Sequence, residues 1–362
     1  MSTELVIKNA TIVGRREVRA RGFLRARGGM ITDIGTGAVA CRSAIDFMGD
    51  YLVPGIVDLH TDNLERNVAP RTAVRWPMLS ALLIHDTQLI GAGITTALDA
   101  IAIGESRNDK PSRDIRREMV DDALAMLETS RRKSLLRADH FVHLRLDVSN
   151  ERILQLFEKY AIAPGARLVS LVDRRPLAPQ NGETGSTGER ERRRAARMAL
   201  AQRAAALSLT TASHDDRTAD EIALAAAIGV RIAEFPETET AAGEARVRGM
   251  AVAMGAPNVV RGGSQHAGHA SAIGLERVGC LDLLCSDYVP FSLMHAVFVL
   301  HKGHGVDLAS AMRMVSAVPA ELAGFNDRGE LVTGKRADMI RVFLLDAQPV
   351  VRAVWRHGER VA

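Results

Sequence analysis

Three scarcities in this 362-residue chain each exclude a class of protein. The chain has three cysteines, Cys41, Cys280 and Cys285, whose spacing fits neither a disulfide framework nor a metal knuckle and suits a reducing cytoplasm. Aromatic residues make up 4% of the chain, too few to provide stacking platforms for nucleic-acid bases. No apolar stretch is long enough to span a bilayer, and the first residues do not form a signal peptide. We therefore expect a cytoplasmic protein with neither a nucleic-acid partner nor a membrane partner.

The remaining composition is that of a globular protein with a substantial core, because 47% of the residues are hydrophobic and 25% are charged. The net charge of +4 is small for this length. Arginine outnumbers lysine, and a guanidinium group can hold a phosphate through two hydrogen bonds at once. A chain of this length accommodates one large domain and a smaller appendage.

The two ends of the chain alternate in hydrophobicity as short strands do. Residues 5–13 begin this pattern, and residues 334–355 repeat it near the C-terminus. Neither end has enough strands to enclose a core alone. We therefore predict that the ends pair in one small β-sandwich domain, residues 1–53 plus 329–362, beside a central domain of residues 54–328.

The central residues alternate between strand and helix patterns, and eight such units over about 250 residues fit a (β/α)8 TIM barrel. A doubly wound open sheet is the alternative, but it leaves the two β-rich ends without a role. Helices are expected over residues 77–91, 113–132, 151–160, 190–208, 218–229 and 240–254. The expected strands end near His60, Ile101, Asp147, Asp173, His214, Phe235, Gly263 and Asp287.

The most informative motif lies in residues 54–65, which read PGIVDLHTDNLE. Side chains alternate between the two faces of a strand, so Asp58, His60 and Asp62 project to the same side. An imidazole and carboxylates at this spacing can share a divalent cation. The carboxyl end of a strand is also where barrel enzymes place catalytic groups. A polar surface turn is the alternative interpretation.

Other predicted strands end in similar side chains. Arg145 and Asp147 share one strand face, while His214, Glu234 and Asp287 each follow apolar or small residues. Several carboxylates buried at one barrel rim would repel one another and lose hydration, at a cost on the order of several kcal/mol. A divalent metal ion offsets this cost, so the pattern predicts metal-dependent chemistry.

This arrangement resembles the amidohydrolase superfamily, with an Asp-x-His-x-Asp motif after the first strand, a histidine after the fifth and an aspartate after the eighth. One branch is more similar still: the enzymes that hydrolyse α-D-ribose 1-methylphosphonate 5-triphosphate in the carbon–phosphorus lyase pathway. The similarity spans essentially the whole chain, and its motifs lie in residues 60–65, 213–216, 233–236, 255–264 and 286–290.

The resemblance implies a hydrolase acting on a phosphoric anhydride, in which a metal-activated water attacks the α-phosphate and diphosphate leaves. It implies a divalent metal, zinc, as one or two ions, with Asp287 accepting the proton of the water. The metal ligands that it implies are His60, Asp62, Asp147, His214 and Glu234.

Phosphate contacts are expected from Arg145 and from the segment after the seventh strand, which contains Arg261, Gly262, Gly263 and Ser264. Barrel enzymes often bind phosphate there through backbone N–H groups, and glycine allows close approach. The expected partner is a phosphorylated small molecule, and a homo-oligomer is compatible with the sequence.

The chain departs from the branch pattern at three places. Arg174 stands where the branch has a histidine, Asp147 where it has a glutamate, and Gln265 lies in an altered Gly-Gly-Ser-His stretch. Two alternatives therefore stay open: hydrolysis of a C–N bond in a cyclic amide or N-acyl substrate, or a relative that has lost catalysis. Residues 174–191 are expected to form a long loop, either an active-site lid or an exposed insertion.

Overall fold

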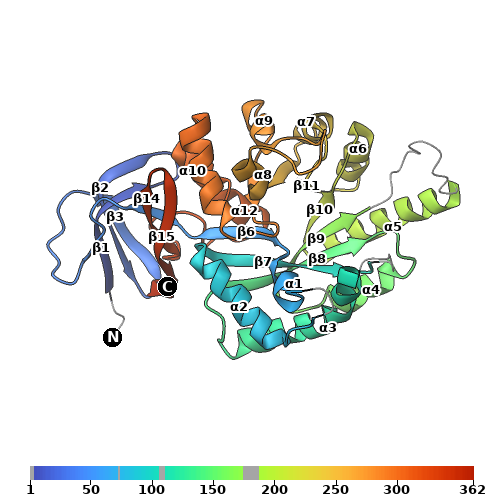
Figure 1. The fold of residues 1–362 in the computed structure, drawn as a ribbon, viewed down its shortest axis with the longest axis horizontal. Coiled ribbons are helices and arrows are strands. Elements are labelled where there is room, and N and C mark those ends of the chain that lie inside the picture. The colour runs from blue at the N-terminus through green and yellow to red at the C-terminus, as the bar shows by residue number, and fades with distance from the viewer. Residues whose placement is uncertain (1–3, 72–73, 106–110, 174–186) are drawn as a thin grey trace.

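A computed structural model describes residues 4–71, 74–105, 111–173 and 187–362. Arg174 and most of the loop expected after the fourth strand lie outside these residues. The described chain forms a parallel barrel surrounded by helices and a separate mixed sheet built from both chain ends (Figure 1). The predicted TIM barrel with a β-sandwich domain is thereby confirmed. Within the described ranges, no helix combines the length and apolarity needed to cross a membrane.

Eight parallel strands form the barrel, each hydrogen-bonded to the next one along the chain. They are β6 (Ile56–Thr61), β7 (Ile94–Ile103), β8 (Asp139–Asp147), β9 (Ala166–Val172), β10 (Thr210–His214), β11 (Ile232–Glu234), β12 (Ala251–Gly255) and β13 (Leu283–Cys285). The barrel closes beside β6 and β13, where Asp62 N donates to Asp287 O over 2.7 Å and Asp287 N donates to His60 O over 3.0 Å. Because the first and last strands meet, the open doubly wound sheet is excluded.

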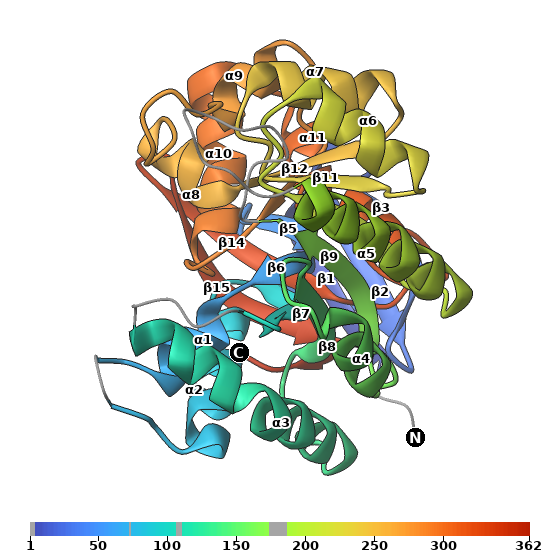
Figure 2. The same ribbon diagram turned by 90° about the vertical axis from the view of Figure 1, so that its right-hand side faces the viewer.

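Helices surround the parallel strands (Figure 2). They are α1 (Asn63–Val68), α2 (Met78–Gly91), α3 (Pro111–Arg132), α4 (Ile153–Tyr160), α5 (Thr187–Ala206), α6 (Ala219–Ala227), α7 (Glu239–Val247), α8 (Ala256–Arg261), α9 (Ala272–Arg277), α10 (Ser292–His304), α11 (Leu308–Arg313) and α12 (Ala317–Leu322). Local sequence sets several helix ends. At the start of α6, the Thr218 side chain accepts from Glu221 N while the Glu221 carboxylate accepts from Thr218 N, which satisfies two backbone donors.

One stretch differs from the prediction. We expected a helix over residues 240–254 and a strand ending near Gly263, whereas α7, β12 and α8 divide this stretch into helix, strand and helix. Gly249 has a φ of +71°, a left-handed conformation in which a helix cannot continue. Pro257 lies in the first turn of α8, where its missing N–H is harmless. The prediction was wrong here because runs of alanine, valine and methionine show no hydrophobic periodicity, so a buried strand and a buried helix cannot be distinguished from the sequence.

The second sheet joins the two ends of the chain, as predicted. It contains β1 (Glu4–Val13), β2 (Val18–Arg27), β3 (Met30–Thr36), β4 (Ile45–Asp46), β5 (Tyr51–Pro54), β14 (Met339–Leu345), β15 (Gln348–Arg356) and β16 (Glu359–Arg360). β14 pairs antiparallel with β5 and places Ile340 opposite Val53. This sheet encloses a core of its own, in which the rings of Phe47 and Trp355 stack with centroids 5.9 Å apart. The residue boundaries of the two domains stay a prediction.

An ion-pair cluster ties the second sheet to the barrel. Asp139, the first residue of β8, accepts hydrogen bonds from Arg328 (2.8 Å), Arg336 (2.7 Å) and Arg356 (2.7 Å), and Arg356 belongs to β15. Burial raises the pKa of the Asp139 carboxyl, but the three guanidinium groups outweigh burial and lower it. One carboxylate at the amino-terminal end of a barrel strand therefore holds three arginines from the C-terminal part of the chain.

Candidate active site

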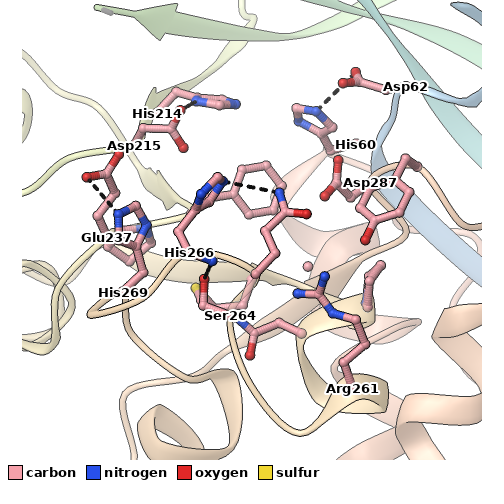
Figure 3. A pocket seen from close by; sticks show the side chains of 18 of the residues that line it. His60, Asp62, His214, Asp215, Glu237, Arg261, Ser264, His266, His269 and Asp287 are labelled. Carbon is pink, nitrogen blue, oxygen red and sulfur yellow. Dashed lines mark hydrogen bonds and ion pairs between the residues drawn. The ribbon is translucent and has the colours of Figure 1, made fainter.

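The carboxyl ends of the barrel strands surround a cavity of about 480 Å³. His60 from β6 and His214 from β10 line it, together with Asp62 and Asp287, which lie just beyond β6 and β13 (Figure 3). Arg145 from β8 lines it as well. This end of the barrel is where TIM-barrel enzymes have their active sites. The volume suits a small ligand.

His60 lies at the centre of the cluster, between two carboxylates. Its Nδ1 is 2.8 Å from Glu234 Oε1, and its Nε2 is 3.3 Å from Asp62 Oδ1. Burial disfavours charge on this imidazole, but the attraction of Glu234 and Asp62 outweighs burial and raises the pKa of His60 to about 10. Burial likewise raises the pKa of Glu234, yet the neighbouring imidazoles outweigh it and lower that pKa. The carboxylates thus favour a positive charge at this position.

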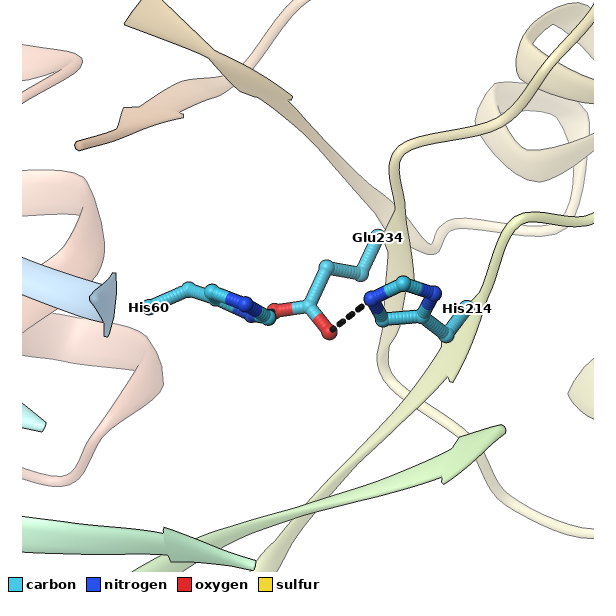
Figure 4. Close-up of side chains that lie close together, drawn as sticks. All are labelled: His60, His214 and Glu234. Carbon is cyan, nitrogen blue, oxygen red and sulfur yellow. Dashed lines mark hydrogen bonds and ion pairs between the residues drawn. The ribbon is translucent and has the colours of Figure 1, made fainter. Parts of the chain in front are cut away.

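His214 faces Glu234 from the side opposite His60 (Figure 4). Its buried Nε2 has no hydrogen-bond partner in the described structure and lies 4.0 Å from Glu234 Oε2, beyond hydrogen-bond range. A divalent cation held by His214 and Glu234 would give this nitrogen a partner. His60, His214 and Glu234 each offer one ligand atom within 4.8 Å of the others. These residues therefore fit a divalent cation.

A second group of ligand type consists of His60, Asp62 and Asp287, again with atoms within 4.8 Å of one another. Burial and the nearby Asp62 carboxylate raise the pKa of Asp287. The backbone of Asp287 has a φ of +56°, and Asp215 and Phe235, directly after β10 and β11, have φ values of +58° and +56°. Residues other than glycine seldom adopt this conformation, and it concentrates at functional sites. Three residues at the carboxyl end of the barrel therefore have a strained backbone conformation.

Behind the cluster, a buried chain of polar side chains supports Glu234. Ser170 Oγ lies 2.7 Å from Glu234 Oε2 and 2.5 Å from His143 Nε2, and His143 Nδ1 lies 3.0 Å from Leu59 O. Burial lowers the pKa of His143 to about 3, so this imidazole is neutral. The chain fixes the orientation of the Glu234 carboxylate, as partners behind metal ligands do. No sequence signal marked Ser170, because it lies within an ordinary buried strand.

Arg145 lines the cavity, but one of its nitrogens is already engaged. Nη1 donates to both carboxylate oxygens of Asp62, at 2.8 and 2.9 Å. Burial opposes the charge on Arg145, but Asp62 and other carboxylates outweigh it and raise the pKa of the guanidinium. The arginine expected to bind phosphate therefore also positions Asp62.

Asp147 does not join the cluster. Its Oδ1 accepts hydrogen bonds from Ser149 N (3.0 Å) and Ser149 Oγ (2.6 Å), and it is not among the residues that line the cavity. β8 ends at Asp147, and the turn that follows uses this carboxylate. Strand alternation aligned Asp147 with Arg145, but Asp147 is the last residue of β8, and Ser149 of the following turn engages its carboxylate. In the described structure Asp147 thus lies outside the ligand-type groups, and its role as a metal ligand stays a prediction.

The two glycines expected to bind phosphate end a helix instead. Gly262 has a φ of +80°, and its N–H donates to Val259 O over 3.1 Å. The N–H of Gly263 donates to Asn258 O over 2.8 Å. Both amides therefore satisfy carbonyl groups at the end of α8 and are not free to cradle a phosphate. Arg261 and Ser264, the other two residues of that prediction, do line the cavity.

Further residues that the sequence analysis left unassigned line the cavity. Glu237 accepts from Arg217 Nε (2.5 Å) and Nη2 (3.1 Å), and its Oε2 lies 3.7 Å from His269 Nε2. His266 also lines the cavity. The available signal was weak, because both histidines lie in the altered Gly-Gly-Ser-His stretch, away from any predicted strand end.

Comparison with solved structures identifies the fold of the protein. N-acetylglucosamine-6-phosphate deacetylase from Pasteurella multocida has a TM-score of 0.66 at 15% identity, covering 99% of this chain and 100% of that chain. A 5-methylcytosine deaminase from Klebsiella pneumoniae has a TM-score of 0.69 at 16% identity, covering 99% and 98%. The chain therefore shares the fold of these two enzymes.

No protein-family model matches the chain. A curated relative, the α-D-ribose 1-methylphosphonate 5-triphosphate diphosphatase of Escherichia coli K12, is 35% identical over 383 residues. The match covers 99% of this chain and 100% of the relative. The chain belongs to the family of α-D-ribose 1-methylphosphonate 5-triphosphate diphosphatases. The resemblance inferred from its motifs is thereby confirmed.

Proposed function

We propose that the protein hydrolyses α-D-ribose 1-methylphosphonate 5-triphosphate between its α- and β-phosphates and releases diphosphate. The observation that carries this proposal is the cluster of His60, Asp62, His214, Glu234 and Asp287 beside one cavity. The 35% identity to a relative of that name supports the choice of substrate.

The proposed metal ligands are His60, Asp62, His214 and Glu234. Two imidazoles and two carboxylates suit zinc, which accepts nitrogen and oxygen donors in four-coordinate sites. When bound, such an ion lowers the pKa of a coordinated water toward neutrality and offsets charge on phosphoryl oxygens. The three cysteines are free thiols, which agrees with the proposed cytoplasmic location.

Asp287 accepts the proton of the attacking water in this proposal. Its raised pKa gives the carboxylate a higher proton affinity than an ordinary aspartate has, which favours general-base catalysis near neutral pH. Glu234 holds Nδ1 of His60, so the Nε2 of that ring faces Asp62 and the cavity. Arg145 holds Asp62 in place from the other side.

The test is hydrolysis by purified, zinc-loaded protein. We expect a ribosyl 5-triphosphate to yield diphosphate rather than orthophosphate, measured by phosphorus NMR. Removal of the metal by a chelator should abolish the reaction, and added zinc should restore it. Hydrolysis of a dihydropyrimidine without any release of diphosphate would instead support cleavage of a C–N bond. Protein that cannot hold stoichiometric metal would support a relative that has lost catalysis.

A further inference from the structure

One short segment, residues 261–269, begins at the last residue of α8. It forms the wall of the cavity that lies across from the ligand-type cluster (Figure 3). Its cavity-lining side chains include a guanidinium, an amide and two imidazoles, and the segment contains no acidic residue. None of these side chains belongs to the groups of ligand type described above. The proposed metal chemistry therefore leaves them without a role.

Arg261 differs from the other arginines of the cavity. Arg145 and Arg217 are each held by a carboxylate, at 2.8 Å and 2.5 Å. Arg261 Nη2 donates to Gly263 O over 3.1 Å, and no ion pair to Arg261 occurs among the described residues. A guanidinium has five N–H donors, so most of those of Arg261 remain for an anion that enters the cavity.

His266 points from the same segment toward the cluster (Figure 3). Its Nε2 lies 3.3 Å from the side-chain amide nitrogen of Gln265, and its ring centroid lies 5.1 Å from that of His269. His269 faces Glu237 at 3.7 Å, whereas no carboxylate pairs with His266 in the part of the chain that the structure describes. Arg261 and His266 are thus two nitrogen donors on one segment without acidic partners.

We propose that Arg261 and His266, assisted by Gln265, hold the two terminal phosphates of the substrate, so that the leaving diphosphate faces residues 261–269. The inference rests on the proposed function. The bond between the α-phosphorus and the oxygen bridging to the β-phosphate breaks, and its electron pair stays on that oxygen, which leaves with the diphosphate. The water oxygen forms the new bond to the α-phosphorus, and its proton goes to Asp287. The two side chains offset the charge that the diphosphate gains.

The opposite direction of binding is less favourable. The neighbouring wall of the cavity carries Asp215 and Glu237 (Figure 3). The Asp215 carboxylate repels a polyanion, whereas Arg217 offsets the charge of Glu237. Residues 261–269 present no carboxylate. Terminal phosphates directed toward this segment therefore meet hydrogen-bond donors and avoid like charge.

Binding of inorganic diphosphate tests the subsite without any reaction. Isothermal titration calorimetry of zinc-loaded protein should show affinity roughly 10-fold or more weaker in Arg261→Ala and in His266→Ala, because each change removes a hydrogen bond to a charged group. Bound zinc, measured by elemental analysis, should not change. Arg277→Ala at the end of α9 and His304→Ala at the end of α10 are matched controls and should bind as the unchanged protein does. Equal affinity in all four variants would overturn the subsite.

Turnover of a ribosyl 5-triphosphate separates this inference from the proposed function. We expect Arg261→Ala and His266→Ala to lower kcat/KM by roughly 10-fold or more. If the unchanged protein releases diphosphate and both variants match it in kcat and KM, the subsite is wrong and the proposed function stands. If the unchanged protein releases none but binds diphosphate through these two residues, the subsite stands and the proposed function is wrong.

Discussion

Neighbouring charges set the protonation of each ionisable side chain at the barrel mouth. Glu234 and Asp62 raise the pKa of His60 to about 10, whereas burial, with help from the positive charges of His60 and Arg145, lowers the pKa of the neighbouring His143 to about 3. The two rings lie edge to face with centroids 5.0 Å apart. These two neighbouring histidines therefore have different roles. His60 faces the cavity, and His143 supports the cluster from behind.

Asp287→Asn tests the proposed proton acceptor. The amide keeps the size of the side chain but cannot take a proton, so turnover should fall roughly 10²- to 10⁴-fold while bound metal and fold are retained. Steady-state rates and elemental analysis provide the measurements. Asp346→Asn is the matched control, because Asp346 lies exposed between β14 and β15 at a φ of +48°, which asparagine tolerates. A near-normal rate in Asp287→Asn would show that another group accepts the proton.

His60→Ala tests the shared ligand. His60 belongs to both groups of ligand type, so its removal should lower bound zinc as well as turnover. Elemental analysis after dialysis measures the metal, and His304→Ala is the control. Unchanged zinc content in His60→Ala would place the cation on other residues.

At the scale of secondary-structure elements, a buried network joins α2 to two barrel strands. Asp99 of β7 lies 2.7 Å from His85 Nε2 of α2 and 2.8 Å from His140 Nδ1 of β8. The remaining ring nitrogens face Asn63 at 2.9 Å and Asp86 at 3.4 Å. Since every ring nitrogen has a partner, these residues fix the packing of elements, although their types would also suit a metal.

Asp99→Asn should destabilise the fold in a pH-dependent way. Burial opposes charge on His140, but Asp99 and Asp86 outweigh it and raise the pKa of His140 to about 9. The stability from this pairing is complete below the ordinary histidine pKa of 6.5 and is lost as pH rises through about 9. At neutral pH, we expect the free energy of unfolding in urea to fall by roughly 3–5 kcal/mol. The loss of stability that remains in Asp99→Asn as pH rises should begin at a lower pH than in the unchanged protein.

Asp121→Asn is the control for that experiment. Asp121 pairs with Lys159 at 2.8 Å, but its side chain is 68% exposed. An exposed ion pair contributes about 0–1 kcal/mol, so its removal should change stability little. If Asp99→Asn and Asp121→Asn behaved alike, the buried network would not contribute to stability.

At the scale of the whole molecule, Asp139 connects the second sheet to the barrel through three arginines. These arginines lower its pKa, so the stability that it contributes is present above the ordinary aspartate pKa of 3.8 and is lost as pH falls through the lower folded-state value. The attachment of the two sheets should therefore weaken in acid.

Asp139→Asn should lower the free energy of unfolding by roughly 2–4 kcal/mol at neutral pH, because it removes one charge that three buried or half-buried cations share. Thermal unfolding followed by circular dichroism measures the effect, with Asp346→Asn as the control. The difference from the unchanged protein should shrink in acid. If the difference in the free energy of unfolding stayed constant as pH fell, the charge of Asp139 would not be the cause of the destabilisation.

Local patterns in the chain predict the barrel, the pairing of the two ends and the residues at the ends of β6, β10, β11 and β13. Hydrophobic alternation and short motifs are local, so they can be interpreted without coordinates. Three features could not be predicted without the coordinates: Asp147 serves a turn, the amides of Gly262 and Gly263 close a helix, and His266 faces the cluster. These outcomes depend on where a strand stops and on which distant segments meet, because hydrogen bonds and packing across the fold choose among the conformations that local sequence allows.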